Sequence, residues 1–268
     1  MRIATSTNLI SFNRDGSKTE MVHLLPLYAK EGFRVLDLNL CEMLNPHASL
    51  AGEQWKEYAE RLGQLKHQHT LIFNQAHAPY ARSGEILEEM LTRALQICHL
   101  LGIPILVVHP IPGTIEENHN AFLPYLKAAE AYRVVLAFEN LNEEGEMTDI
   151  ADFTALVESF ASPFAGICYD TGHAHMCGHD LAKDITMMGS RLVATHIADN
   201  KGKNDEHLLP FYGTIDWEDV LAALSQIGYQ GDLTYECMFF NQHLPLQLKV
   251  QAIRQAKLIG DFLLSRVP

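Results

Sequence analysis

Short apolar runs alternate with longer amphipathic runs along this sequence of 268 residues. Most of the short runs are rich in aliphatic residues, which is typical of strands buried on both faces. The runs predicted as strands are Arg2–Thr7, Arg34–Leu40, Leu71–His77, Ile105–His109, Val134–Glu139, Phe164–Asp170, Leu192–Ile197 and Asp232–Glu236. A predicted helix follows each of them, at Met21–Glu31, Gly52–Lys66, Ser83–Leu101, Ile115–Tyr132, Asp149–Phe160, Leu181–Arg191, Trp217–Ile227 and Leu246–Leu264.

This alternation predicts a parallel sheet of the α/β class. About 250 residues is the usual size of a (β/α)8 barrel, in which eight parallel strands close into a ring surrounded by helices. The alternative is an open doubly wound sheet, which often carries a Gly-rich first turn. This sequence lacks such a turn. We therefore predict a single (β/α)8 TIM barrel, formed by one domain over residues 1–268.

The charge balance and the cysteines narrow the class of protein. The chain has 20 Lys and Arg against 33 Asp and Glu, a formal net charge of −13. This acidic balance argues against a protein that binds the phosphate backbone of nucleic acid. The five cysteines include no C-x-x-C pair, as expected of reduced thiols. The sequence shows no signal peptide and no apolar run near the roughly 20 residues of a membrane span, so we expect a cytoplasmic protein without a membrane partner.

Side chains suited to bind a metal end six successive predicted strands. They are His77, His109, Glu139, Asp170, His196 and Glu236. In a (β/α)8 barrel the functional groups lie at the carboxyl ends of the strands, so all six are predicted on one rim. One histidine at a strand end is more often structural than functional. Six donors in succession, however, predict a metal site.

Two polar segments add further candidate ligands. Asp170 is followed by Thr171–Gly172, predicted as a turn, and then by His173. The long polar loop 198–213 contains Asp205 and His207 in a D-x-H pattern. Polar residues in such loops are often exposed to solvent and have no functional role, and we predict this for His175 and His179.

The candidate ligands differ in how strongly they indicate a metal. Glu139 and Glu236 follow apolar runs, where an unpaired carboxylate is costly to bury, so a bound cation is the simplest partner. Asp170 and His196 are placed in a similar way. For His77, His109 and His173 two interpretations stay open, because each is suited either to bind a metal or to hydrogen-bond a substrate.

At these positions the chain resembles the xylose-isomerase-like TIM barrel superfamily over essentially its whole length. That superfamily includes sugar and sugar phosphate isomerases and epimerases, and it is related to the type IV apurinic endonucleases. The motifs that carry the resemblance are F-E-N at Phe138–Asn140, D-T-G-H at Asp170–His173, H-I-A-D at His196–Asp199, D-E-H-L at Asp205–Leu208, G-T-I-D-W at Gly213–Trp217 and Y-E at Tyr235–Glu236.

The two branches of the superfamily imply different metal contents. Resemblance to the ketose epimerases implies one divalent ion bound by Glu139, Asp170, His196 and Glu236, with both glutamates also acting as acid and base. Resemblance to the endonucleases implies a zinc cluster. Its additional ligands would be His77, His109, His173, Asp205 and His207. Many sugar isomerases of the superfamily keep several of these residues, so both interpretations stay open.

One segment departs from the pattern of the superfamily. Many relatives have G-x-G after the D-x-H pair, where this chain has Pro210–Gly213. The two aromatic residues there, Phe211 and Tyr212, are expected to narrow the pocket or to cover the substrate. The departure bears on the class of substrate more than on the fold.

The resemblance implies a metal-dependent isomerase or epimerase of a small polyhydroxy carbonyl compound. Such an enzyme moves a proton next to a carbonyl through an enediolate, stabilised by Mn, Co, Mg or Zn. The alternatives are a zinc-dependent phosphodiesterase acting on abasic DNA, a lyase or dehydratase using the same enolate chemistry, and a sugar-binding barrel without catalysis. Relatives often form dimers or tetramers, so a homodimer or homotetramer is also implied.

Overall fold

Eight parallel strands form one sheet in the part of the chain that the computed structural model describes, residues 1–80, 84–142 and 147–267. The strands are β1 (Ile3–Ser6), β2 (Val35–Asn39), β3 (Ile72–His77), β4 (Ile105–Val108), β5 (Val135–Glu139), β6 (Ala165–Asp170), β7 (Leu192–His196) and β8 (Leu233–Tyr235). From β1 to β7 each strand pairs with the next one in sequence, and β8 pairs with β1. Every predicted strand is present, to within one or two residues at each end.

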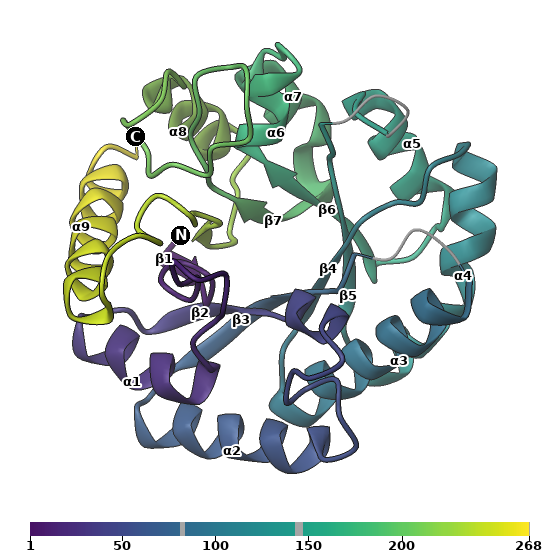
Figure 1. Ribbon diagram of the computed structural model, residues 1–268. Coiled ribbons are helices and arrows are strands. Elements are labelled where there is room, and N and C mark those ends of the chain that lie inside the picture. Colours follow the sequence, from purple (N-terminus) through teal and green to yellow (C-terminus); the bar gives the residue numbers. More distant parts are fainter. Residues whose placement is uncertain (81–83, 143–146, 268) are drawn as a thin grey trace.

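The sheet closes on itself between β7 and β8. The N–H of Ile197, just after β7, donates to the carbonyl oxygen of Thr234 at 2.7 Å. The N–H of Glu236, just after β8, donates to the carbonyl oxygen of Ile197 at 3.1 Å. Figure 1 shows the resulting ring of strands with the helices around it. The predicted (β/α)8 TIM barrel is confirmed, because an open sheet would leave these two strands apart.

Helices follow the strands at the predicted places. They are α1 (Met21–Lys30), α2 (Trp55–Gln68), α3 (Gly84–Leu101), α4 (Ile115–Tyr132), α5 (Ile150–Ser159), α7 (Leu181–Met188), α8 (Trp217–Gln226) and α9 (Leu246–Ser265). Ser83, the predicted start of α3, lies outside the described residues. Short 3-10 turns occupy Cys41–Leu44 and Gly189–Arg191. None of the described helices is long and apolar enough to cross a membrane.

One segment differs from its prediction in a way that matters for the site. Thr171 and Gly172 were expected to turn the chain, but they begin the short helix α6 (Thr171–Met176). Asp170 caps this helix, since its Oδ1 accepts the N–H of His173 at 2.7 Å. The helix therefore starts directly at the end of β6 and holds His173 in a buried position.

Side chains alternate between the outside and the inside of the barrel along each strand. On β5, Leu136 and Phe138 belong to the large core between the strands and the helices. Ala137, between them, faces the interior. There it joins Val107, Cys168 and Ala194 in a separate small apolar cluster. These residues stand two positions before His109, Glu139, Asp170 and His196, so the cluster forms a floor directly below the carboxyl-terminal rim.

Candidate metal centre

The six predicted strand-end donors lie together at the carboxyl-terminal rim of the barrel. His77, Glu139, Asp170 and His196 are the last residues of their strands, while His109 and Glu236 follow β4 and β8 directly. All are buried except His109, whose side chain is 17% exposed. Below the donors of β4 to β7 the interior floor is apolar, so the carboxylates of Glu139 and Asp170 find their partners at the rim.

The first group of donors consists of Glu139, Asp170, His196 and Glu236. One ligand atom from each lies within 4.8 Å of the others, and all four side chains are buried. Nδ1 of His196 is 2.7 Å from Oε1 of Glu139 and 3.6 Å from Oε2 of Glu236. These four residues come from β5, β6, β7 and the end of β8, so their convergence requires the closed barrel.

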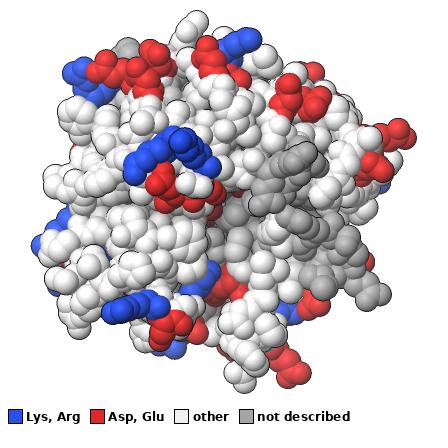
Figure 2. Space-filling model, turned by 45° about the horizontal axis from the view of Figure 1, so that its top comes forward, with Lys and Arg blue, Asp and Glu red and all other residues white. Residues whose placement is uncertain are grey.

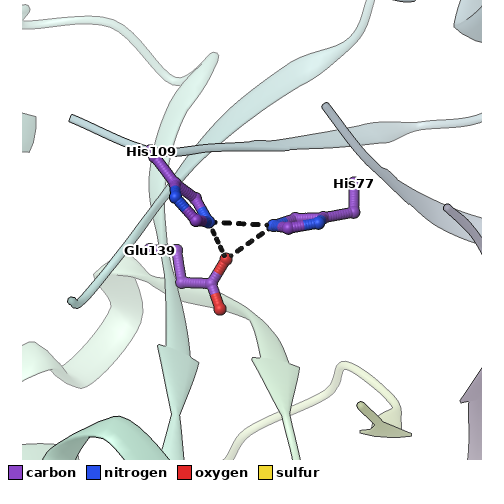
Figure 3. Close-up of side chains that lie close together, drawn as sticks. All are labelled: His77, His109 and Glu139. Atoms are coloured by element: carbon purple, nitrogen blue, oxygen red, sulfur yellow. Dashed lines mark hydrogen bonds and ion pairs between the residues drawn. The ribbon is translucent and has the colours of Figure 1, made fainter. Parts of the chain in front are cut away.

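A second group shares Glu139 with the first. Nε2 of His77 and Nε2 of His109 lie 2.9 Å and 3.1 Å from the other oxygen of Glu139, Oε2, and 3.0 Å from each other. Figure 3 shows the two imidazoles and the carboxylate pointing toward one another. The carboxylate of Glu139 thus stands between the two groups, with one oxygen turned toward each.

A third group comes from the loops. Oδ2 of Asp205 lies 3.3 Å from Nε2 of His173 and 2.9 Å from Nε2 of His207. The structure therefore brings the predicted D-x-H pair into contact with the histidine of α6. His175 and His179 lie apart from this group: His175 contacts Thr214 and His179 contacts Asp184.

In three of these histidines, Nδ1 has a hydrogen-bond partner that is not one of the donor side chains. Nδ1–H of His173 donates to the carbonyl oxygen of Asn140 at 2.8 Å. Nδ1–H of His207 donates to the carbonyl oxygen of Glu236 at 2.8 Å. Nδ1 of His77 lies 3.2 Å from Sγ of Cys41. Such outer contacts set which nitrogen offers its lone pair, and they commonly accompany histidines that bind metal.

The electrostatics of the rim favour a bound cation. Burial alone would raise the pKa of Glu139, but the imidazoles of His196 and His77 hold it well below its usual range. Burial would likewise lower the pKa of His196, yet Cys168 and Glu139 raise it well above its ordinary value. Burial raises the pKa of Asp170 to about 6, and Glu139 and Glu236 act in the same direction. The carboxylates of this rim thus favour positive charge on the groups beside them, and a bound cation would meet the same demand.

Two unpaired oxygens test whether the site fits a metal. Oδ2 of Asp170 and Oδ1 of Asp205 are buried and have no hydrogen-bond partner among the described residues. Buried polar atoms are rarely left unpaired without a reason. Together with the convergent carboxylate and imidazole donors, they are consistent with a divalent metal site.

Sequence reasoning missed several residues at this rim. Cys41 was not singled out, and Phe12 and Phe239 were overlooked, although their rings lie 4.5 Å apart and Phe239 lies 6.1 Å from His207. Phe211 and Tyr212, expected to narrow the pocket or cover the substrate, are both more than half exposed. Phe211 packs edge-on against Phe262 of α9 at 5.7 Å. The position of the Phe211 ring depends on its contact with α9, which the sequence around Phe211 does not indicate.

A model of the family described as "Xylose isomerase-like TIM barrel" matches residues 26–254. The chain therefore belongs to the xylose isomerase-like TIM barrel family, and the resemblance inferred from its motifs is confirmed.

Sequence relatives fall in both branches of that family. The chain is 30% identical over 173 residues to the uncharacterized protein y4fM of Sinorhizobium fredii, covering 60% of this chain and 55% of that protein. It is 25% identical over 162 residues to the L-ribulose 3-epimerase of Methylomonas sp., covering 56% and 55%. It is 34% identical over 116 residues to the endonuclease 4 of Thermus thermophilus, covering 40% and 43%. The matched part thus spans only about half of each of these relatives.

Solved structures share the fold over nearly the full length. The D-psicose 3-epimerase of Clostridium cellulolyticum, solved with D-tagatose, has a TM-score of 0.78 at 16% identity, covering 98% of this chain and 99% of that one. The IOLI protein, solved with a binding zinc atom, has a TM-score of 0.78 at 19% identity, covering 100% and 99%. At these identities the likeness establishes the fold.

Proposed function

We propose that the protein is a divalent-metal-dependent isomerase or epimerase of a small polyhydroxy carbonyl compound, a ketose or its phosphate. The observation that carries the proposal is the first donor group, in which Glu139, Asp170, His196 and Glu236 converge within 4.8 Å. Three carboxylates and one imidazole suit Mn, Co or Mg, while the imidazole-rich second and third groups suit Zn.

In this proposal, Glu139 and Glu236 have the roles of acid and base. Glu139 approaches the centre from β5 and Glu236 from the end of β8, on different sides of the barrel. When bound, a divalent ion supplies Lewis-acid stabilisation of negative charge that develops on the substrate oxygens. One glutamate then takes the proton from the carbon next to the carbonyl, and the other returns a proton. Return to the same carbon from the opposite face gives an epimer, and return to the neighbouring carbon gives an isomer.

The known activities of relatives support this class of reaction. An L-ribulose 3-epimerase is among the sequence relatives, and D-psicose 3-epimerases are among the structural ones. Both names describe the inversion of one carbon of a ketose, which is the reaction that two opposed glutamates can perform.

Activity on a panel of ketoses and their phosphates, in D2O, tests the proposal. Metal-loaded protein should exchange one carbon-bound proton for deuterium and form the epimer or isomer of at least one panel member. Glu236→Gln should lose this activity. Glu206→Gln is the matched control, because Glu206 follows Asp205 in the loop but its carboxylate is paired with Lys201 at 3.6 Å. Loss of water from the ketose instead would identify a lyase, and no reaction with any member would contradict the proposal.

A second candidate function is a zinc-dependent phosphodiesterase acting on abasic DNA. It is favoured by the second and third donor groups, which an epimerase with one metal ion does not need. The net charge of −13 counts against it. Outside the grey residues, the face in Figure 2 carries its Lys and Arg in small separate groups beside Asp and Glu. Incision of an abasic duplex would establish this function, and an intact duplex would exclude it.

A further inference from the structure

One buried carboxylate inside the barrel belongs to none of the three donor groups. Asp37 lies on β2, and its side chain is fully buried. Although β2 and β7 are not neighbours in the sheet, Oδ2 of Asp37 lies 3.3 Å from Nε2 of His196. The contact therefore crosses the interior of the barrel from one wall to another.

Packing does not explain an acidic side chain at this position. The interior of a (β/α)8 barrel is usually filled by branched apolar residues, and a buried carboxylate is costly unless it is paired. The flanking Leu36 and Leu38 belong to the core between strands and helices, so Asp37 is the residue of this strand segment that faces inward. Its other oxygen, Oδ1, has no partner among the described residues. His196 is thus the hydrogen-bond partner that the structure shows for Asp37.

His196 stands between two carboxylates, one at each ring nitrogen. Nδ1 lies 2.7 Å from Oε1 of Glu139, and Nε2 lies 3.3 Å from Oδ2 of Asp37. A neutral imidazole has one N–H, so it can donate to only one of them and offers a lone pair at its other nitrogen. Metal binding in the first donor group needs that lone pair on Nδ1, and the proton must then be on Nε2.

We propose that Asp37 is a positioning residue of the metal centre, which accepts the Nε2–H of His196 and so keeps Nδ1 available to the metal. The inference rests on the metal-binding part of the proposed function. In an Asp37→Asn variant the amide accepts a weaker hydrogen bond, and it can turn its own NH2 group toward Nε2. The imidazole proton then moves to Nδ1, where the carboxylate of Glu139 accepts it, and this tautomer competes with the metal.

Metal affinity tests the proposal in the 268-residue chain. The measurement is Zn²⁺ binding in competition with a chromophoric chelator, for the wild type and for Asp37→Asn. Asp184→Asn is the matched control, since Asp184 is also a buried carboxylate paired with a histidine, His179 at 2.8 Å, but lies on α7 away from the donors. We expect Asp37→Asn to weaken binding by about 10- to 100-fold, the usual effect of losing an outer partner of a metal-bound histidine. The control should bind as the wild type does.

The outcomes separate this inference from the function it rests on. Equal affinities in the wild type and in Asp37→Asn overturn the inference and leave the metal site intact. Absence of Zn²⁺ binding by the wild type overturns the metal-binding part of the proposed function instead. In a His196→Gln background, Asp37→Asn should cause no additional loss, and a further loss of the same size would show that Asp37 does not act through His196.

A measurement on the wild type covers the case in which Asp37→Asn does not fold. In protein labelled with ¹⁵N-histidine and loaded with Zn²⁺, the resonances that disappear in His196→Gln identify His196. We expect a protonated Nε2 and a metal-bound Nδ1. A protonated Nδ1 with a free Nε2 would overturn the inference.

Discussion

The interior of the barrel differs between its two sides. Below the donors of β4 to β7 lie Val107, Ala137, Cys168 and Ala194, which form an apolar cluster. Two positions before the rim residues of β2, β3 and β8, at the same level, lie Asp37, Gln75 and Thr234, all polar and buried. These side chains interact across the barrel: Oγ1 of Thr234 donates to Oε1 of Gln75 at 3.3 Å, and Asp37 contacts His196.

The difference suggests a division of tasks. The described contacts show no hydrogen bond from the apolar cluster to Glu139 or Asp170, so the charges of these carboxylates must be compensated at the rim, by histidines or by a cation. In such a medium of low dielectric constant, each charge interacts more strongly with its neighbours than it would in water. On the polar side, Asp37 lies below the rim and contacts His196, a proposed metal ligand. The apolar side therefore strengthens the interactions of the charged carboxylates, and the polar side orients His196 through Asp37.

The largest effect is expected from removing charge above the apolar side. Glu139→Gln should lower kcat on the substrate found in the ketose panel by about 10²- to 10⁴-fold, the usual contribution of a general acid or base. Glu139 is also the residue that joins the first and second donor groups, so metal content should fall too. Steady-state kinetics with circular dichroism as a check of folding will measure this. If Glu139→Gln and Glu236→Gln both keep full activity, the proposed mechanism is wrong.

The ion pair between Asp205 and His207 in the third donor group should make the free energy of unfolding depend on pH. Burial alone would lower the pKa of His207, but Asp205 raises it to about 9 in the folded protein. An unfolded imidazole has a pKa of about 6.5, so the folded state holds the proton more tightly. This contribution to the free energy of unfolding is complete below about pH 6.5 and is lost as the pH rises through about 9. Its size is at most about 3 kcal/mol.

Urea unfolding of chelator-treated protein at pH 6.5 and pH 9 measures that loss. Other histidines of the rim also have raised pKa values, among them His77 and His173. The informative quantity is therefore the difference between the wild type and His207→Gln, which should lose less stability over this pH range. An equal loss in the two proteins would show that the ion pair with Asp205 does not stabilise the fold.

Added volume on the apolar side should be poorly tolerated. Ala137→Leu places a larger side chain into a floor of small residues, two positions before Glu139, and should lower the free energy of unfolding by about 1–3 kcal/mol. Because the rim rests on this floor, Zn²⁺ affinity should fall as well. Urea unfolding and chelator competition measure the two effects. A stable variant with unchanged affinity would show that the floor does not position the donors.

A substitution on the polar side should cost less stability than Ala137→Leu on the apolar side. Thr234→Val keeps the shape of the side chain but removes the hydroxyl that accepts from Asn74 at 3.0 Å and donates to Gln75. A loss of about 1–2 kcal/mol is expected, because Asn74 and Gln75 are left without this buried partner. Thr234→Ser, which keeps the hydroxyl, is the control for that bond. A larger loss in Thr234→Ser than in Thr234→Val would mean that the methyl group matters more than the hydrogen bonds.

Much of this architecture could be predicted because it follows from short-range patterns. The alternation of runs located all eight strands, and the rule that functional groups occupy carboxyl ends placed Glu139, Asp170 and His196 on one rim. Residues that act through contacts across the barrel could not be found in this way. Asp37 is the one acidic residue of β2, whose other residues are Val35, Leu36, Leu38 and Asn39. The sequence shows this acidic residue, but its role can be recognised only when the fold brings β2 and β7 face to face.

Other features depended on details that a single sequence does not contain. The helix at Thr171–Met176 arises because Asp170 caps it, which six residues without helical periodicity did not reveal. The register between β2 and β3 shifts after Leu36, so that Asp37 lies opposite Gln75. The outer hydrogen bonds of His173 and His207 go to backbone carbonyl oxygens, for which no side-chain pattern exists.

The most direct test of the central claim is the metal content of the protein, measured by elemental analysis after purification without chelator or affinity metal. We predict at least one equivalent of a divalent ion per chain, retained through gel filtration. About one Mn, Co, Mg or Zn would support the epimerase or isomerase, and two or three Zn would favour the phosphodiesterase. A chain that contains no metal, and binds none when Mn²⁺ or Zn²⁺ is added back, would contradict the account of this rim as a metal centre.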